Sequence, residues 1–265
     1  MPDAALGAPC WADVMLPDLA AGKRFYGGLF GWTFDESAEG ADAYTPALLE
    51  GRQVAALGRK SDGRMPTAWT LYLHTPDMTA TVERVRDAGG TVIGGPLRVG
   101  DGPAGVTAVV ADPDGAVFGL WQPSAFAGFE VRDKPGSYLW GELYARDKEV
   151  ADAFYPAVFD YTTADISEED ADFLLWAPAG KPADAEHAVG GRALVAEVFP
   201  AEMPPHFLTY FAVSDCDEAV SRAEELGGRV AFPAETSQYG RFAVLFDNQG
   251  ATFAVLDSSV TGQDG

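Results

Sequence analysis

The chain has 265 residues, of which 47% are hydrophobic and 12% aromatic, and this composition is typical of a globular protein with one or two domains. Forty acidic residues against eighteen basic ones give a net charge of −22, which argues against nucleic acid and membrane surfaces as partners because both are anionic. No apolar run approaches the roughly 20 residues that a membrane helix needs. The N-terminus lacks the features of a secretory signal, and Cys10 and Cys216 lie at non-matching places, so we expect a reduced, cytoplasmic protein.

The first half of the chain alternates between strand and helix patterns. Residues 11–16 place side chains on two faces with a period of two, which predicts a half-buried strand. Asp18 and Asp77 each precede a helical pattern and are predicted N-caps, and the second helix, 78–88, is expected to stop at Gly89. The other predicted strands of this half are 43–49, 53–58, 67–73, 91–93, 106–111 and 116–121.

The second half repeats this pattern. Three pairs of segments match in the same order: CWADVMLPDLAAGKRFYGGLFGW with SYLWGELYARDKEVADAFYPAVFDY, MPTAWTLYLHTPD with MPPHFLTYFAVSD, and DPDGAVFGLW with DNQGATFAVL. Collinear matches of this kind predict a duplicated domain. We therefore expect a first domain over residues 1–124, a linker over 125–136, a second domain over 137–258 and a flexible tail over 259–265.

These motifs resemble the vicinal oxygen chelate superfamily, which includes glyoxalase I, extradiol dioxygenases and the bleomycin- and fosfomycin-resistance proteins. The resemblance is carried by the strand–Asp–helix openings that end in FYGGLFGW and FYPAVFDY, by the AGG and LGG turns and by the DPDG turn. More narrowly, the chain is similar to tandem-domain glyoxalase-like proteins of actinobacteria, often labelled hydroxylases. The resemblance implies an α+β fold of two tandem domains, each made of paired βαβββ units that form a cup-shaped mixed sheet with helices outside.

Relatives in this superfamily hold a metal ion in the cup, with ligands on the first and last strands of a unit. Carried over by spacing from the helix-capping Asp and the DPDG-type turn, these ligand positions are Trp11, Thr70, Gly119, Trp140, Leu208 and Ala254. None of these residues offers the imidazole, carboxylate or thiolate that a divalent ion requires. We therefore expect no metal site and no cofactor.

The alternation of the strands predicts which side chains line the cups instead. An aromatic-rimmed hollow with a few polar groups is typical of a small-molecule site. The alternative is that the same rings simply fill the cups as core. The predicted ligand-binding residues are Trp11, Asp13, Tyr72 and Trp121 in the first repeat, and Trp140, Tyr144 and Tyr210 in the second.

The second repeat offers more reactive chemistry than the first. Glu142 and His206 are expected on the inner wall of its cup, where they are candidate catalytic residues and are predicted to pair across the sheet. A carboxylate among aromatic rings is desolvated, which raises its pKa toward the range useful for acid–base catalysis. A structural Glu142 tied to a backbone donor or to Arg192 is the alternative.

Three functions remain open on the sequence. The first is a metal-independent protein that binds a small aromatic or apolar molecule in natural-product metabolism or resistance. The second is an acid–base enzyme, such as an isomerase, a lyase or a hydroxylase-like tailoring enzyme, that uses Glu142 or His206. The third is a structural or interaction protein with filled cups. Because both domains lie in one chain, we expect a monomer or a weak dimer.

Overall fold

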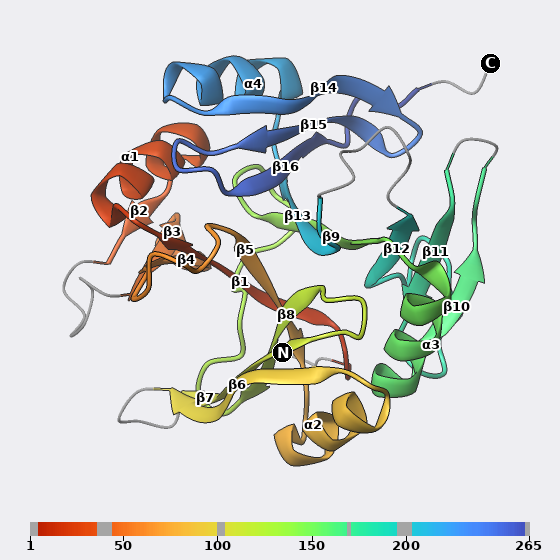
Figure 1. The fold of residues 1–265 in the computed structure, drawn as a ribbon. Coiled ribbons are helices and arrows are strands. Elements are labelled where there is room, and N and C mark those ends of the chain that lie inside the picture. The colour runs from red at the N-terminus through yellow and green to blue at the C-terminus, as the bar shows by residue number, and fades with distance from the viewer. Residues whose placement is uncertain (1–4, 36–43, 100–103, 169–170, 195–202, 263–265) are drawn as a thin grey trace. The chain divides into compact units, whose positions relative to one another are not determined.

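The computed structural model describes residues 5–35, 44–99, 104–168, 171–194 and 203–262, in which four βαβββ units follow one another along the chain (Figure 1). The elements of the first repeat are β1 Pro9–Leu16, α1 Leu19–Phe30, β2 Thr33–Phe34, β3 Tyr44–Leu49, β4 Arg52–Arg59, β5 Trp69–His74, α2 Met78–Asp87, β6 Thr91–Val99, β7 Gly105–Ala111 and β8 Val117–Pro123. Those of the second are β9 Tyr138–Ala145, α3 Lys148–Phe159, β10 Thr162–Asp165, β11 Phe173–Ala177, β12 Gly190–Leu194, β13 His206–Ala212, α4 Cys216–Glu225, β14 Arg229–Ser237, β15 Gly240–Phe246 and β16 Thr252–Asp257.

Each repeat forms one eight-stranded mixed sheet. The strand orders are β2-β3-β4-β1-β5-β8-β7-β6 and β10-β11-β12-β9-β13-β16-β15-β14, so the two sheets have the same topology. The predicted α+β fold of two tandem domains, each built from paired βαβββ units, is confirmed. None of the helices in the described ranges is long and apolar enough to cross a membrane.

Every described helix of these four units begins after an aspartate. Asp18 accepts a hydrogen bond from the Ala21 amide at 2.9 Å, and Asp77 accepts one from the Ala80 amide at 3.1 Å, so both predicted N-caps are confirmed. Asp147 and Asp215 act in the same way at the N-termini of α3 and α4. A capping carboxylate satisfies amide groups that would otherwise lack a partner in the first turn.

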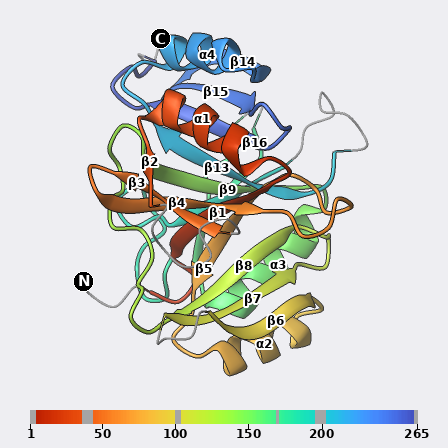
Figure 2. The same cartoon turned by 90° about the vertical axis from the view of Figure 1, so that its left-hand side faces the viewer.

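The compact units of the chain do not coincide with the repeats. One unit, called unit 1 below, contains residues 1–11, 70–128 and 141–207, and unit 2 contains residues 12–69, 129–140 and 208–265. Each unit therefore combines one helix from each repeat: α2 packs with α3 in unit 1, and α1 packs with α4 in unit 2, as Figure 2 shows for the latter pair. The domain boundaries predicted at residues 124, 136 and 258 follow the sequence duplication. They stay a prediction.

A buried hydrogen bond links the two repeats within unit 2. The Tyr26 hydroxyl donates to Oδ2 of Asp247 at 2.9 Å and accepts from the Trp69 indole at 3.0 Å. Burial and the nearby Asp247 charge raise the pKa of Tyr26 well above its ordinary value, so the hydroxyl keeps its proton. Around this bond the rings of Phe25, Tyr26 and Phe30 from α1 pack against Phe253 of β16.

Unit 1 repeats this arrangement with the roles of the repeats exchanged. The Tyr155 hydroxyl of α3 donates to Oδ2 of Asp112 at 3.0 Å, while the other oxygen of Asp112 accepts from the amides of Gly115 and Ala116. Burial raises the pKa of the Asp112 carboxyl, against the lowering effect of these hydrogen bonds. The FY motif of either repeat thus binds the aspartate that opens the last turn of the other repeat.

The paired glycines after α2 and α4 have a packing role in the same contacts. A Cβ placed on Gly90 would lie 2.8 Å from the Phe154 ring, and one on Gly228 would lie 3.0 Å from the Phe25 ring. Both glycines therefore let the first helix of the other repeat approach closely. This contact explains why the AGG and LGG turns and the FY motifs occur together in each repeat.

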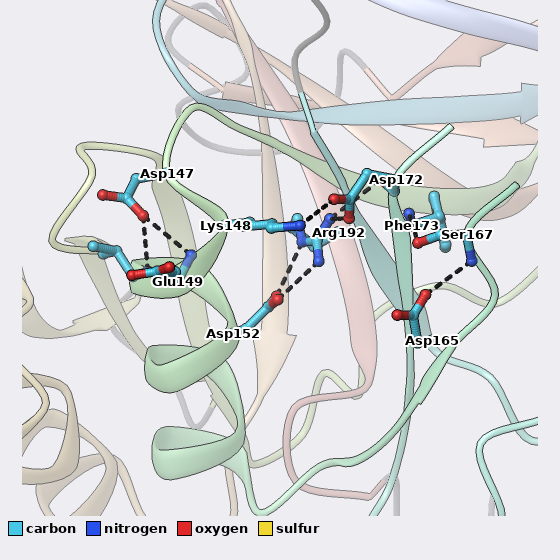
Figure 3. Close-up of polar contacts among 10 residues, drawn as sticks. Asp147, Lys148, Glu149, Asp152, Asp165, Ser167, Asp172, Phe173 and Arg192 are labelled. Atoms are coloured by element: carbon cyan, nitrogen blue, oxygen red, sulfur yellow. Dashed lines mark hydrogen bonds and ion pairs between the residues drawn. The ribbon is translucent and has the colours of Figure 1, made fainter. Parts of the chain in front are cut away.

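A charged cluster holds α3 against the outer strands of its sheet (Figure 3). The Arg192 side chain is only 3% exposed and pairs with Asp152 of α3 at 2.8 Å and with Asp172. Lys148 pairs with Asp172 at 2.6 Å. Hydrogen bonds from Lys148 and Arg192 lower the pKa of the Asp172 carboxyl below its ordinary value. The alternative in which Arg192 binds Glu142 is not what the structure shows, because Arg192 faces the helix.

Removing the buried tyrosine hydroxyls should destabilise the fold. Tyr26→Phe leaves both Asp247 and Trp69 without their buried partner, and we expect a loss of roughly 1–3 kcal/mol in the free energy of unfolding. Tyr155→Phe leaves only Asp112 without its hydroxyl partner, so the loss in the free energy of unfolding should be smaller. Urea unfolding measures both changes. Tyr239→Phe, at a 58% exposed side chain, is the control, and an equal loss there would contradict the assignment.

The Asp172 cluster should make the free energy of unfolding depend on pH in the acidic range. The folded pKa of Asp172 is depressed, so its contribution is present above the unfolded pKa of about 3.9 and disappears as the pH falls through the folded value. Asp172→Asn should lower the free energy of unfolding at pH 7 by about 1–3 kcal/mol, and the difference from the wild type should shrink toward pH 3. Asp217→Asn, which breaks an exposed pair with Arg241, should have a smaller effect. A difference that does not change with pH would contradict this account.

Candidate functional site

The face of each sheet opposite its helices, called the inner face below, carries the predicted site residues. Leu16 and Leu57 approach Gly22 of α1, so their side chains define the helix-facing side of β1 and β4. Phe118 and Phe253 mark the same side of β8 and β16, since they pack on α3 and α1. Side chains at the alternate strand positions therefore lie on the inner faces.

In unit 1, the inner face of β9 and β12 presents Glu142 and Tyr144. Glu142 is paired in register with Gly191, and Tyr144 with Ala193, so the acid and the phenol lie on one face beside small residues. Glu142 is 8% exposed, whereas Tyr144 is half-buried. The Phe173 ring lies against Gly191 and leaves no room for a Cβ there. The acid is therefore held in a largely apolar wall.

His206, at the start of β13, joins this wall through its ring. The imidazole is stacked on Tyr144 with centroids 5.6 Å apart and planes inclined by 10°. Its Nδ1 lies 2.9 Å from the carbonyl oxygen of Pro204, an arrangement that suits a protonated Nδ1. Burial lowers the pKa of His206 from 6.5, and the Pro204 hydrogen bond opposes this only in part, so the ring is neutral at pH 7. The structure thus brings His206 to Tyr144, while its pairing with Glu142 stays a prediction.

The metal-ligand positions implied for unit 1 do not fit a metal ion. Trp11 has an indole, Thr70 has a hydroxyl and Gly119 has no side chain, so none of them offers an imidazole, a carboxylate or a thiolate. Gly119 is paired in register with Tyr72, and a Cβ built on Gly119 would overlap the Tyr72 ring. The space that a ligating side chain would need at this position is therefore filled by a phenol ring.

The corresponding positions in unit 2 are equally unsuited. Trp140, Leu208 and Ala254 carry no imidazole, carboxylate or thiolate, and Leu208 and Ala254 are buried. Within the described ranges, no group of three or more His, Cys, Asp or Glu residues could hold a metal ion. The positions that correspond to the superfamily's metal ligands thus carry side chains in this chain that do not suit a divalent ion.

Two predicted aromatic residues of unit 1, Trp11 and Trp121, both pack on Phe126. Trp11 meets Phe126 edge-on at 4.8 Å, and Trp121 meets Phe126 at 5.9 Å. The Trp121 indole also donates to the Phe126 carbonyl at 2.9 Å. Trp11 and Trp121 are 5% and 6% exposed, so these rings form a closed cluster. Phe126 belongs to the predicted linker and was not a predicted site residue, because composition alone marked its segment as a connection.

The inner face in unit 2 carries one buried tyrosine ring and two half-buried phenylalanine rings. Tyr210 is paired with Ala254, and Phe242 with Leu256, so these side chains share one face of β13, β16 and β15. Phe242 stacks on Phe232 of β14 with centroids 5.8 Å apart and planes inclined by 9°, and Tyr210 lies 6.5 Å from Phe242. Phe232 and Phe242 are both half-buried. The sequence prediction found Tyr210 but missed this pair, although the alternation of Phe242, Val244 and Phe246 was the available signal.

Asp13, the predicted polar residue of the first repeat, is paired in register with Ala56 in unit 2. It is 3% exposed and accepts a hydrogen bond from the Tyr44 hydroxyl at 3.0 Å. Tyr44 was not predicted, because its strand was recognised but its inner face was not assigned. In the second repeat Phe173 takes the register position of Tyr44, so the equivalent strand cannot offer a hydroxyl to Glu142.

Unit 2 also has a cavity of about 330 Å³ away from the predicted residues. Its walls are the end of α1 at Gly28–Phe30, the segment Pro135–Gly136 and the start of α4 at Val213–Arg222. Arg222 there donates to the Gly28 carbonyl at 3.2 Å and to Glu225 at 2.8 Å. These groups stabilise helix ends.

Known proteins with similar sequences cover almost the whole chain. Residues 12–121 match the family model described as a glyoxalase-like domain. The anthracycline biosynthesis protein DnrV of Streptomyces peucetius is 38% identical over 96% of this chain and 94% of its own length. The CFP32 protein of Mycobacterium bovis, provisionally named a glyoxylase, is 37% identical over 94% of each chain.

Solved structures with low sequence identity share the fold. A Mn(II)-bound glyoxalase from Novosphingobium aromaticivorans has a TM-score of 0.63 and 16% identity, over 98% of this chain and 87% of its own. A 2,2',3-trihydroxybiphenyl 1,2-dioxygenase from Sphingomonas wittichii has a TM-score of 0.64 and 13% identity, over 96% of this chain and 91% of its own. At such identities the likeness concerns the fold alone.

The pKa of His206 can be tested directly. Its imidazole proton resonances, assigned with a His206→Gln variant, should titrate with a pKa below 6.5 because burial disfavours the charged ring. Tyr144→Ala removes the stacked ring and should move the value back toward 6.5. Proton NMR over pH 4 to 8 measures both, and a pKa above 6.5 in the wild type would refute the described environment.

Proposed function

Since the chain belongs to the vicinal oxygen chelate superfamily, in its glyoxalase-like branch, we propose that it binds a flat, aromatic small molecule without a metal ion. The binding surface would be the inner faces of the sheets, where other members of the fold place their chemistry. The predicted lining residues divide by repeat: a ligand in the first repeat would contact Trp11, Asp13, Tyr72 and Trp121, and a ligand in the second repeat would contact Trp140, Tyr144 and Tyr210.

The half-buried pair Phe232 and Phe242 carries this proposal. The two stacked rings beside Tyr210 give an apolar, aromatic surface, and such surfaces bind aromatic ligands by ring contacts and by burial of apolar area. At the ligand positions of the superfamily the chain has indole, leucine and alanine side chains, which favour contact with an organic molecule over coordination of an ion.

The similarity to DnrV supports a role in natural-product metabolism. DnrV is named for anthracycline biosynthesis, and anthracyclines contain a fused aromatic ring system, which the aromatic side chains Phe232, Phe242 and Tyr210 of unit 2 could contact. We propose a polycyclic aromatic compound as the class of ligand. A cytoplasmic protein that is a monomer or a weak dimer is also part of the proposal.

An acid–base enzyme is the second candidate, and the grouping of Glu142, Tyr144 and His206 favours it. Glu142 and Tyr144 share one inner face, and the neutral His206 ring is stacked on Tyr144. A neutral imidazole stacked on Tyr144, together with the Glu142 carboxyl on the same face of that strand, has the components of proton transfer to and from a bound molecule. In that case Glu142 or His206 would act as the base.

A thermal-shift experiment tests the proposed function. Emodin, a flat fused-ring aromatic compound, should raise the melting temperature of protein that has been dialysed against EDTA. At one hundred times its dissociation constant the ligand adds about 2.7 kcal/mol to stability, which corresponds to roughly 5–10 °C for a chain of this size. Adding Mn(II) or Zn(II) should not change the shift.

A Glu142→Gln variant separates the two candidates. In both cases the variant should keep the emodin shift within error. Only an enzyme should also lose turnover of its substrate, so turnover is the measurement that separates the candidates. Absence of any shift with emodin and with a panel of fused-ring aromatics would refute the proposed function. A shift that disappears after EDTA treatment and returns with metal would refute metal independence.

A further inference from the structure

We propose that the chain binds a single ligand molecule, on the inner face of β13, β16, β15 and β14, and that the matching face of the first repeat is closed by its own side chains. This inference rests on the proposed function and deepens it, because it assigns the site to one repeat. The two faces can be compared position by position, since their strands have the same order and the same register.

Closure of the first-repeat face begins at Gly119. Tyr72 and Gly119 are register partners on β5 and β8, and the Tyr72 ring lies so close to Gly119 that any Cβ there would overlap it. The ring therefore lies directly against Gly119. A ligand on this part of the face would have to displace a packed phenol.

The linker completes the closure. Phe126 packs between Trp11 and Trp121, and its own amide and that of Ser124 both donate to the Ala104 carbonyl, at 3.2 and 3.1 Å. The Trp121 indole donates to the Phe126 carbonyl, so the segment is bonded to the face on both sides. The rings of Trp11 and Trp121 are consequently core here and do not contact the ligand.

The second-repeat face differs at each of these points. Ala254 replaces Gly119, so its methyl group occupies the space that the Tyr72 ring takes in the first repeat, and the Tyr210 ring instead lies toward Phe242. Leu256 stands at the position of Trp121, and Phe242 at that of Thr107. The segment 258–262, which follows β16, contains no aromatic residue that could act as Phe126 does.

What remains is an apolar surface that is only partly covered. Phe232, Phe242, Val244 and Leu256 are all half-buried, and Val244 is paired with both Phe232 and Ala254 in the register. Stacked phenylalanine rings beside aliphatic side chains favour contact with an aromatic ring system over contact with a highly polar molecule. The net charge of −22 disfavours anionic ligands, so we assign an uncharged or cationic polycyclic aromatic compound.

Isothermal titration with emodin, with tryptophan fluorescence as a second readout, tests the assignment. The wild type should bind one equivalent. Phe242→Ala should weaken binding by about tenfold or more through loss of the stacked ring, and Thr107→Ala, the matched change in the first repeat, should leave affinity within about twofold. Phe242→Leu keeps apolar volume without the ring and should also weaken binding, which covers the case that Phe242→Ala does not fold.

Two equivalents bound to the wild type would overturn this inference and leave the proposed function standing. The same holds if Thr107→Ala weakens binding while both Phe242 variants bind normally, because the site would then lie in the first repeat. No binding of emodin or of any other fused-ring aromatic would instead overturn the proposed function, and this inference with it.

Discussion

The structure depends on one buried contact that occurs twice: a tyrosine hydroxyl of one repeat donating to an aspartate of the other. Tyr26 binds Asp247 in unit 2, and Tyr155 binds Asp112 in unit 1. Each aspartate also accepts amide hydrogen bonds that shape the turn before its last strand. A buried carboxylate is costly unless every oxygen has a partner, so helix, turn and strand must form together. This arrangement also fixes the position of strands β8 and β16 in the inner faces, because both strands begin at those turns.

Much of the fold could be predicted from the sequence, because its signals are local or repeated. The capping aspartates Asp18 and Asp77, the strand periodicity and the three matched segments gave the βαβββ units and the family. The division into compact units could not be found in this way, since it depends on which helix packs against which repeat. The roles of Phe126 and Tyr44 also could not be predicted, because they depend on tertiary contacts. Their roles arise from a linker folding back and from a register across three strands, and neither leaves a periodic pattern.

The chemistry of the inner faces follows from substitutions at a few strand positions. Where other members of the fold hold an ion, this chain has Trp11, Thr70 and Gly119 in one repeat and Trp140, Leu208 and Ala254 in the other. The helix-facing side, where Phe118 and Phe253 are fully buried, supplies core contacts that do not involve these positions. The inner faces are therefore free to carry rings, an acid or an imidazole without loss of the fold.

The crossed arrangement of the helices has a consequence for how such proteins can change. Because α1 belongs to the same compact unit as β16, and α3 to the same unit as β8, neither repeat owns a complete core. A single copy of the repeat could satisfy the same contacts only between two identical chains. After fusion, a hybrid gene that exchanges only one repeat with a distant cousin would bring together helices and turns that have not been selected for each other. The two repeats are therefore expected to change together, because the helices of each pack on strands and turns of the other.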